Sequence, residues 1–187
     1  GISARIDDDE KDRYRNDNYV ANIGYQISDQ IRTETYINYT DTFLEYDAVG
    51  LSSTDDNSSD DQQTLFSTKL ILDNGNLLNT IAYNKTYFLR ETVTGYESAT
   101  PAKQMHEGQR DALSLVGKYN LDLDTKVVYG LEYEMDKAEI PSNYTTQSGS
   151  SSYHSAIYAK AGEEIDSQYV DLQFRPLEKF YSTIGLR

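Results

Sequence analysis

The residues of this sequence whose type and spacing suggest a chemical role are acidic. The 187 residues include 31 Asp and Glu against 17 Lys and Arg, and no Cys. Aspartates gather in polar stretches, at Asp7, Asp8 and Asp9, at Asp47, and at Asp60 and Asp61. Calcium takes about six to eight oxygen ligands, so these carboxylates can build a calcium site if neighbouring loops converge. The alternative is that they are solvated loop residues that protect strand edges from aggregation. None of the runs has EF-hand spacing.

Enzyme chemistry and nucleic-acid binding find little support. His106 and His154 are the two histidines and lie in separate polar segments, without metal-ligand spacing, a nucleophile elbow or a phosphate-binding glycine loop. A formal net charge of -14 opposes binding to phosphates, which requires clustered Lys and Arg. We therefore expect neither an enzyme nor a nucleic-acid partner.

Residues 126–137 show the alternation that is typical of a strand with one apolar face. Val127, Tyr129, Leu131, Tyr133 and Met135 have one parity, and Lys126, Gly130, Glu132, Glu134 and Asp136 have the other. Successive side chains of a strand point to opposite faces, so this pattern predicts one apolar and one polar face.

Similar segments and alternating connection lengths extend this pattern along the chain. Short links rich in turn formers, such as Asn74-Gly75, separate the two strands of each predicted hairpin. The predicted hairpins are 17–46, 64–92, 111–137 and 167–187, and the long polar connections between them are 47–63, 93–110 and 138–166. Short turns at one end and long loops at the other are typical of transmembrane barrels. We predict an all-β fold, an antiparallel up-and-down transmembrane β-barrel with about eight strands here.

The alternative fold is a soluble β-sandwich or meander, which also alternates. The predicted strands exceed the usual length of about 5–6 residues, which favours the barrel. Aromatic residues near strand ends are expected in interfacial girdles. Those expected there are Tyr19, Phe43, Tyr46, Tyr87, Phe88 and Phe180. Residues expected to line a hydrated lumen are Arg32, Glu34, Lys69, Lys126, Glu132, Glu134, Asp171 and Arg175.

The closing stretch 170–187 resembles barrels of TonB-dependent outer-membrane transporters, with a strand, the turn Arg175-Pro176, a second strand and Gly185-Leu186-Arg187. Residues 42–48 with Asp60 and Asp61 are similar to the cobalamin-transporter branch, and so is the run Asp7-Asp8-Asp9-Glu10 leading to Tyr14 and Asn18-Tyr19-Val20. The resemblance spans residues 1–187 as barrel. It includes no energy-coupling box, no plug domain and no terminal aromatic residue, whereas family barrels have about 22 strands. It therefore implies a partial barrel domain.

The resemblance implies active transport of a scarce nutrient, with cobalamin as the first expectation, across the outer membrane of a Gram-negative bacterium. The implied partners are outer-membrane lipid, the small ligand, and the TonB energy-coupling complex acting through a plug domain absent here. It implies Asp7, Asp9, Asp47 and Asp60 as calcium ligands, with calcium as a candidate cofactor, and Tyr46 as a substrate contact.

Alternatives from other classes stay open. The ligand can be a siderophore instead of cobalamin. A small eight-stranded barrel can close by itself and serve as a membrane anchor or adhesin, although the missing terminal aromatic residue argues against it. A third alternative is a soluble extracellular β-domain that binds calcium or glycans.

Overall fold

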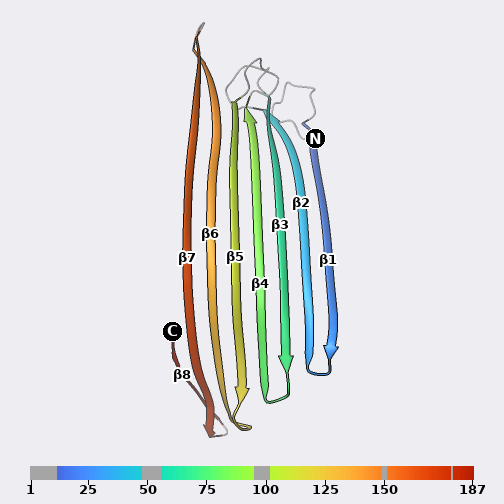
Figure 1. Ribbon diagram of the computed structural model, residues 1–187, viewed down its shortest axis with the longest axis vertical. Coiled ribbons are helices and arrows are strands. Elements are labelled where there is room, and N and C mark those ends of the chain that lie inside the picture. The colour runs from blue at the N-terminus through green and yellow to red at the C-terminus, as the bar shows by residue number, and fades with distance from the viewer. Residues whose placement is uncertain (1–11, 48–55, 95–101, 149–150, 178) are drawn as a thin grey trace.

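The computed structural model describes residues 12–47, 56–94, 102–148, 151–177 and 179–187, which form one antiparallel sheet (Figure 1). Each strand pairs with its neighbours in the chain, in the order β1 to β8. Within the described ranges, no helix has the length and apolarity needed to cross a membrane. The strands are β1 (Tyr14–Ser28), β2 (Ile31–Asp47), β3 (Asp56–Asp73), β4 (Leu77–Thr94), β5 (Ala102–Asn120), β6 (Thr125–Ser148), β7 (Ser151–Leu177) and β8 (Phe180–Leu186).

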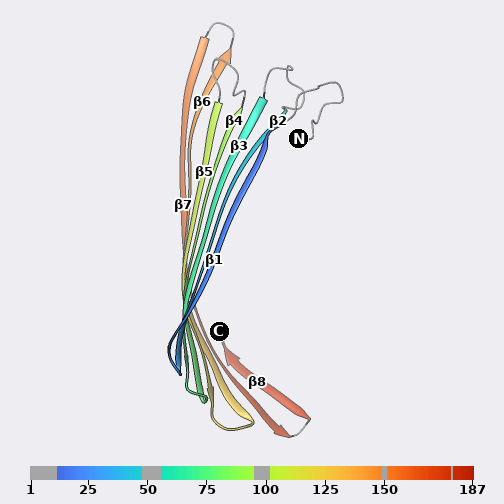
Figure 2. The ribbon, with the colours of Figure 1, turned by 90° about the vertical axis from the view of Figure 1, so that its right-hand side faces the viewer.

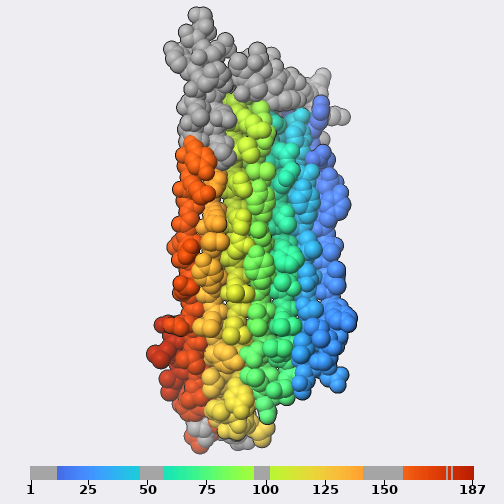
Figure 3. Space-filling model, viewed as in Figure 1, coloured from blue at the N-terminus to red at the C-terminus, as the bar shows by residue number. Residues whose placement is uncertain are grey.

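The sheet is a single tall layer that twists and bends along its length (Figures 2 and 3). Among the described residues, the buried apolar side chains are those of Ile71 and Ala112. No second layer of described residues covers either face. The predicted up-and-down antiparallel architecture is confirmed, and a sandwich of two packed sheets is not what forms. β1 and β8 lie at the two edges and do not pair with each other in the described part, so the sheet is open.

Tight turns join the strands at the lower end of the sheet in Figure 1. Gly75 has φ of +87°, which confirms the predicted need for a residue tolerant of positive φ in this hairpin. Asp73 Oδ1 accepts a hydrogen bond from Gly75 N (2.8 Å), and Asn74 Oδ1 accepts one from Leu77 N (2.8 Å). Side chains of Asx type therefore shape the turn together with the glycine.

The long polar connections predicted from the sequence are much shorter in the structure. β3 already begins at Asp56 and β5 at Ala102, and the ladder between β6 and β7 continues to the pair Ser148–Ser151. The prediction of a loop over 138–166 was therefore wrong. In β7, residues 158–166 are exposed at both parities, and a strand exposed on both faces lacks the apolar alternation that identifies a half-buried strand.

Candidate functional site

The register of the sheet sorts its side chains onto two faces, because directly paired residues share a face. Leu115 pairs with Ile81 and with Leu131, and Ile37 pairs with Ala21 and with Phe66, so apolar residues align across neighbouring strands. We call this side the apolar face and the opposite side the polar face. The apolar face includes Tyr19, Ile23, Tyr25, Ile31, Ile37, Tyr39, Phe66, Leu70, Leu72, Leu77, Ile81, Tyr83, Leu113, Leu115, Tyr119, Val127, Tyr129, Leu131, Tyr133, Met135, Val170, Leu172 and Phe174.

No other described part of the chain covers the apolar face. Ile23 is 63% exposed, Tyr25 67% and Leu131 53%. Aromatic rings contact each other across strands, with 6.3 Å between the ring centroids of Tyr19 and Tyr39. A continuous exposed apolar surface of this extent is unusual for a soluble monomer and marks an interaction surface.

Ionisable side chains end the apolar face at a defined level on each strand. The first ionisable residues met on this face when moving away from the turns are Asp17, Asp41, Asp60, Lys85, Asp111, Lys137 and Asp166, on β1 to β7 in order. Between the turns and this border, the apolar face of these strands has no Asp, Glu, Lys or Arg. On each strand, the stretch between the turn and this border is about 8–12 residues long, and its apolar-face positions are uncharged. This length is close to the roughly 9–11 residues with which a strand crosses a bilayer.

We call a set of directly paired residues that runs across the strands a register row. The border is oblique to these register rows. The row that begins at Asp17 passes through Asp41 and reaches Lys160 on β7, whereas the border residue of β7 is Asp166. The border therefore descends six residues over six strand-to-strand steps. With a rise of about 3.3 Å per residue and about 4.8 Å between strands, this slope corresponds to a strand tilt of about 35°. Membrane barrels have tilts of about 35–45°.

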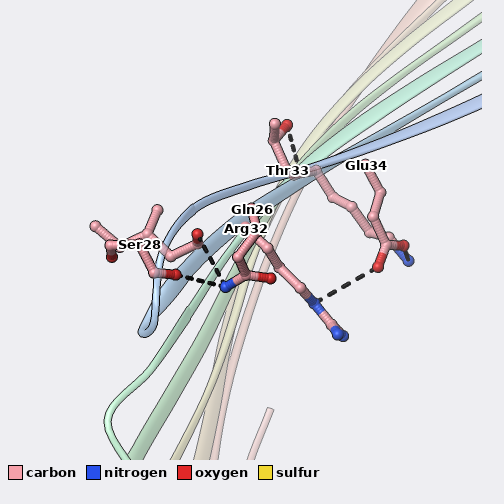
Figure 4. A network of polar contacts seen from close by, with 7 residues as sticks. Gln26, Ser28, Arg32, Thr33 and Glu34 are labelled. Carbon is pink, nitrogen blue, oxygen red and sulfur yellow. Dashed lines mark hydrogen bonds and ion pairs between the residues drawn. The ribbon is translucent and has the colours of Figure 1, made fainter.

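Between the turns and the border, the ion pairs of the described residues lie on the polar face, and Figure 4 shows two of them. Glu34 lies between Lys69 (Nζ to Oε2, 2.7 Å) and Arg32 (Nε to Oε1, 3.5 Å), whereas Thr33 points to the other side and donates a hydrogen bond to the carbonyl of Lys69. The residues predicted to line a lumen lie on this face, with Arg175 at the turn end, where it pairs with Asp124.

Two Arg–Asp pairs on the polar face have the same bidentate geometry. In the first, Arg90 donates to Asp61 from Nε (2.7 Å) and Nη2 (2.8 Å). In the second, Arg110 donates to Asp136 from Nε (2.7 Å) and Nη2 (2.6 Å). Such forks hold both side chains in a fixed orientation while leaving other guanidinium N–H groups free to donate.

Of the predicted calcium ligands the structure describes Asp47 and Asp60, and it does not place these two side by side or next to Tyr46. Asp7 and Asp9 lie outside the described residues. Asp47 pairs with Asp56, whereas Asp60 pairs with Phe43, so the two positions lie four residues apart along the ladder, about 13 Å of strand. Tyr46 pairs with Asn57 and is on the polar face, opposite to Asp60. Among the described residues, no group of three His, Cys, Asp or Glu side chains is arranged to hold a metal.

The surroundings of Asp60 nevertheless disfavour the ionised form of its carboxyl group. Burial raises its pKa above the ordinary value, and the carboxylates of Asp41, Glu91 and Asp61 act in the same direction, whereas Arg15 opposes them. Asp41 Oδ2 accepts a hydrogen bond from Arg15 (2.8 Å), but Asp41 Oδ1 is buried without a hydrogen-bond partner. Negative charge on this part of the apolar face is therefore incompletely compensated.

Two of the predicted girdle residues lie on the wrong face. Phe88 pairs with Gln63 and Gly108, and Tyr46 lies in register with the polar side of β3, so both are on the polar face. Tyr19, Phe43 and Tyr87 are on the apolar face. Tyr87 and Phe88 are adjacent in the sequence, and adjacent residues of a strand point to opposite faces. The sequence alone therefore showed that these two residues could not both belong to the girdle.

Comparison with known proteins shows the fold. The ferric-catecholate import receptor Fiu from E. coli K12 in its open form is similar with a TM-score of 0.60 and 9% identity, over 93% of this chain and 35% of that chain. The unliganded ferric citrate transporter FecA has a TM-score of 0.48, 11% identity, and coverage of 93% and 27%. The translocator domain of the autotransporter NalP from Neisseria meningitidis has a TM-score of 0.41, 10% identity, and coverage of 93% and 60%.

No family model matches the chain, and no curated protein is similar to it in sequence. The chain spans about a third of the length of the Fiu receptor. The similarity to that receptor identifies the sheet as the kind of wall found in a β-barrel.

Proposed function

We propose that this chain forms part of the wall of a bacterial outer-membrane barrel that imports a small nutrient. Its apolar face contacts lipid, its polar face lines a hydrated lumen, its tight turns face the periplasm, and the longer ends of its strands project outside the cell. The observation that carries the proposal is the uncharged segment of about 8–12 residues on the apolar face of each strand from β1 to β7.

The tilt of the charged border supports the same placement. A soluble sheet has no reason to end its apolar face along a line that is oblique to its register rows. A bilayer surface cuts tilted strands along such a line, because the membrane plane is perpendicular to the barrel axis rather than to the strands. The open edges of β1 and β8 fit a sheet that is one portion of a barrel wall.

The import role is an extension by fold similarity, since the Fiu receptor is named as an import receptor for a ferric catecholate. We keep cobalamin, the ligand suggested by the sequence resemblance, as a prediction, with an iron chelate as the alternative. Active import requires energy coupling, which we propose to come from the TonB complex acting through a plug outside residues 1–187. Calcium on the outer segments also stays a prediction.

Membrane placement can be tested by cysteine scanning, because residues 1–187 contain no native cysteine. Single cysteines at positions 127 to 136 of β6 in the intact protein, in outer membranes, are treated with a water-soluble maleimide and, separately, with a lipid-soluble one. We expect labelling with period two. Cysteines replacing Val127, Tyr129, Leu131 and Tyr133 should react from the lipid, and those replacing Val128, Glu132 and Glu134 from water.

Uniform reactivity with the water-soluble reagent on both parities would contradict the proposed placement. The import role has its own test, in which uptake of radiolabelled cobalamin and of a ferric siderophore is compared in cells with and without the intact gene. Loss of uptake of one ligand upon deletion supports import and identifies the ligand class. Unchanged uptake of both ligands contradicts the proposed import of these nutrients while leaving the membrane placement intact.

A further inference from the structure

The polar face has a hollow of about 430 Å³ between β4 and β7, at the level of the charged border. Ligand pockets are typically about 300–1,000 Å³, so this hollow can hold one ring-sized group. Its lining includes the aromatic ring of Phe88 and the small residues Gly108, Ala138 and Ala161. It also includes the charged residues Arg110, Asp136 and Glu163.

The hollow exists because one register row has almost no side chains. Phe88 pairs with Gly108, Gly108 with Ala138, and Ala138 with Ala161, so three adjacent strands contribute no atom beyond Cβ at this level. The row nearer the turns contains Thr86, Arg110, Asp136 and Glu163, whose longer side chains form the lower rim. The hollow is therefore formed by residues of four strands, β4 to β7, and does not depend on a loop.

The charges around the hollow are held by protein partners. The Arg110–Asp136 fork forms part of the lower rim, and the Arg90–Asp61 fork lies beyond Phe88, with Arg90 Cζ 5.4 Å from the centroid of the Phe88 ring. Both guanidinium groups are neutralised by their own carboxylates, so they do not require an anionic ligand. They still offer N–H donors, and Glu163 adds a carboxylate acceptor. Lys137 also lines the hollow but has the parity of the apolar face, so the lining side chains on the polar face carry one positive and two negative charges, which disfavours an anion.

We propose that this hollow binds an uncharged, hydroxyl-rich ring, that is, a sugar unit of a ligand passing through the lumen. The ring places its C–H face against Phe88 and the alanines, and its hydroxyls exchange hydrogen bonds with Arg110, Asp136 and Glu163. The inference deepens the proposed function and rests on it, since water and solutes reach the hollow if the polar face lines a lumen.

Two glycines offer a matched pair for the test. A Cβ added at Gly108 would be 4.0 Å from the Lys137 carbonyl, and one added at Gly24 would be 4.0 Å from the Thr33 carbonyl. Both glycines lie on the polar face, but only Gly108 lines the hollow. The backbone therefore leaves room for a Cβ at either site, and of the two leucine variants only Gly108→Leu places its side chain at the hollow.

The experiment is saturation-transfer NMR on the intact protein in nanodiscs, with methyl β-glucoside and maltotriose at millimolar concentration and galacturonate as the anionic comparison. We expect transfer to the ring protons of both neutral sugars and none to galacturonate. Gly108→Leu should abolish the transfer, Gly24→Leu should retain it, and Phe88→Ala should weaken the apparent affinity about tenfold. If Gly108→Leu does not fold, Ala138→Leu fills the same hollow from β6.

Absence of transfer to either neutral sugar, or equal transfer in the folded Gly108→Leu protein, would overturn the proposed sugar site. Stronger transfer to galacturonate would overturn the assigned ligand class. The cysteine labelling pattern decides membrane placement independently, so a lost sugar site with intact period-two labelling removes only this inference.

Discussion

The hydroxyl of Tyr129 on β6 donates a hydrogen bond to Oδ1 of Asn79 on β4, over a distance of 2.6 Å. The bond passes across β5 at Gly117, which pairs with both residues in one register row. The tyrosine ring occupies the space that a side chain at Gly117 would need, because a Cβ there would overlap the ring. A glycine, an aromatic ring and an amide thus tie three strands together on the apolar face, where a polar side chain without a partner is costly.

Replacing Gly117 should therefore destabilise the sheet. Gly117→Ala forces the Tyr129 ring to move and weakens its bond to Asn79, at a cost of about 1–3 kcal/mol. Tyr129→Phe removes the hydroxyl alone and should cost about 1 kcal/mol. Urea unfolding of the intact protein in lipid vesicles measures both. Gly24→Ala is the control, because a Cβ at Gly24 meets no atom closer than 4.0 Å. Equal stability of Gly117→Ala and Gly24→Ala would contradict this account.

Charge placed on the apolar face should cost free energy according to depth. Leu131→Arg lies mid-way along the uncharged segment of β6 and should cost about 2–4 kcal/mol, whereas Met135→Arg, beside the border residue Lys137, should cost about 0–1 kcal/mol. The polar-face variant Val128→Arg serves as the matched control on the same strand. The measurement is again unfolding in vesicles. A similar loss for all three arginine variants would show that the two faces do not differ in environment.

Asp60 and Asp61 are adjacent but should respond in opposite ways to loss of charge. Asp60 has a raised pKa in the fold, so its contribution to stability is fully present below its ordinary value of 3.8 and is lost as pH rises through the folded pKa. Asp60→Asn should therefore increase the unfolding free energy at pH 7 in a chelator-containing buffer. Asp61→Asn breaks the fork with Arg90 and should lower it by up to about 1 kcal/mol.

Unfolding curves at several pH values between 3 and 8 test this pair of variants, and the stability difference between wild type and Asp60→Asn should shrink towards the acidic end. A destabilised Asp60→Asn protein in chelator would show that the Asp60 carboxylate is compensated at neutral pH.

Calcium binding is the remaining prediction about this region. Isothermal titration of the intact, chelator-treated protein with calcium should show uptake that Asp60→Asn weakens by at least about tenfold, because a carboxylate ligand is lost. Asp61→Asn should leave the uptake unchanged, since its carboxylate is held by Arg90 on the other face. No heat of calcium binding by the intact protein removes calcium from the proposal.

Much of the hairpin arrangement could be predicted from local sequence. The alternation at residues 126–137, the turn at Asn74-Gly75 and the polar-face positions of Arg32 and Glu34 depend on properties of a single strand or turn, and the structure has these features. The prediction of a loop at 138–166 was wrong because residues 158–166 are exposed at both parities, and a strand exposed on both faces lacks the alternation that identifies a half-buried strand.

The sequence by itself determined which side of each strand is apolar, because side-chain parity along a strand is a local property. Only the tertiary structure decided which residues of different strands stand side by side. The register aligns Phe88 with Gly108, Ala138 and Ala161 to make a hollow, seats Tyr129 over Gly117, separates Asp60 from Tyr46, and sets the oblique course of the charged border. These relations depend on where each strand begins to pair with the next, and shifting one strand by two residues would keep every parity while changing every neighbour.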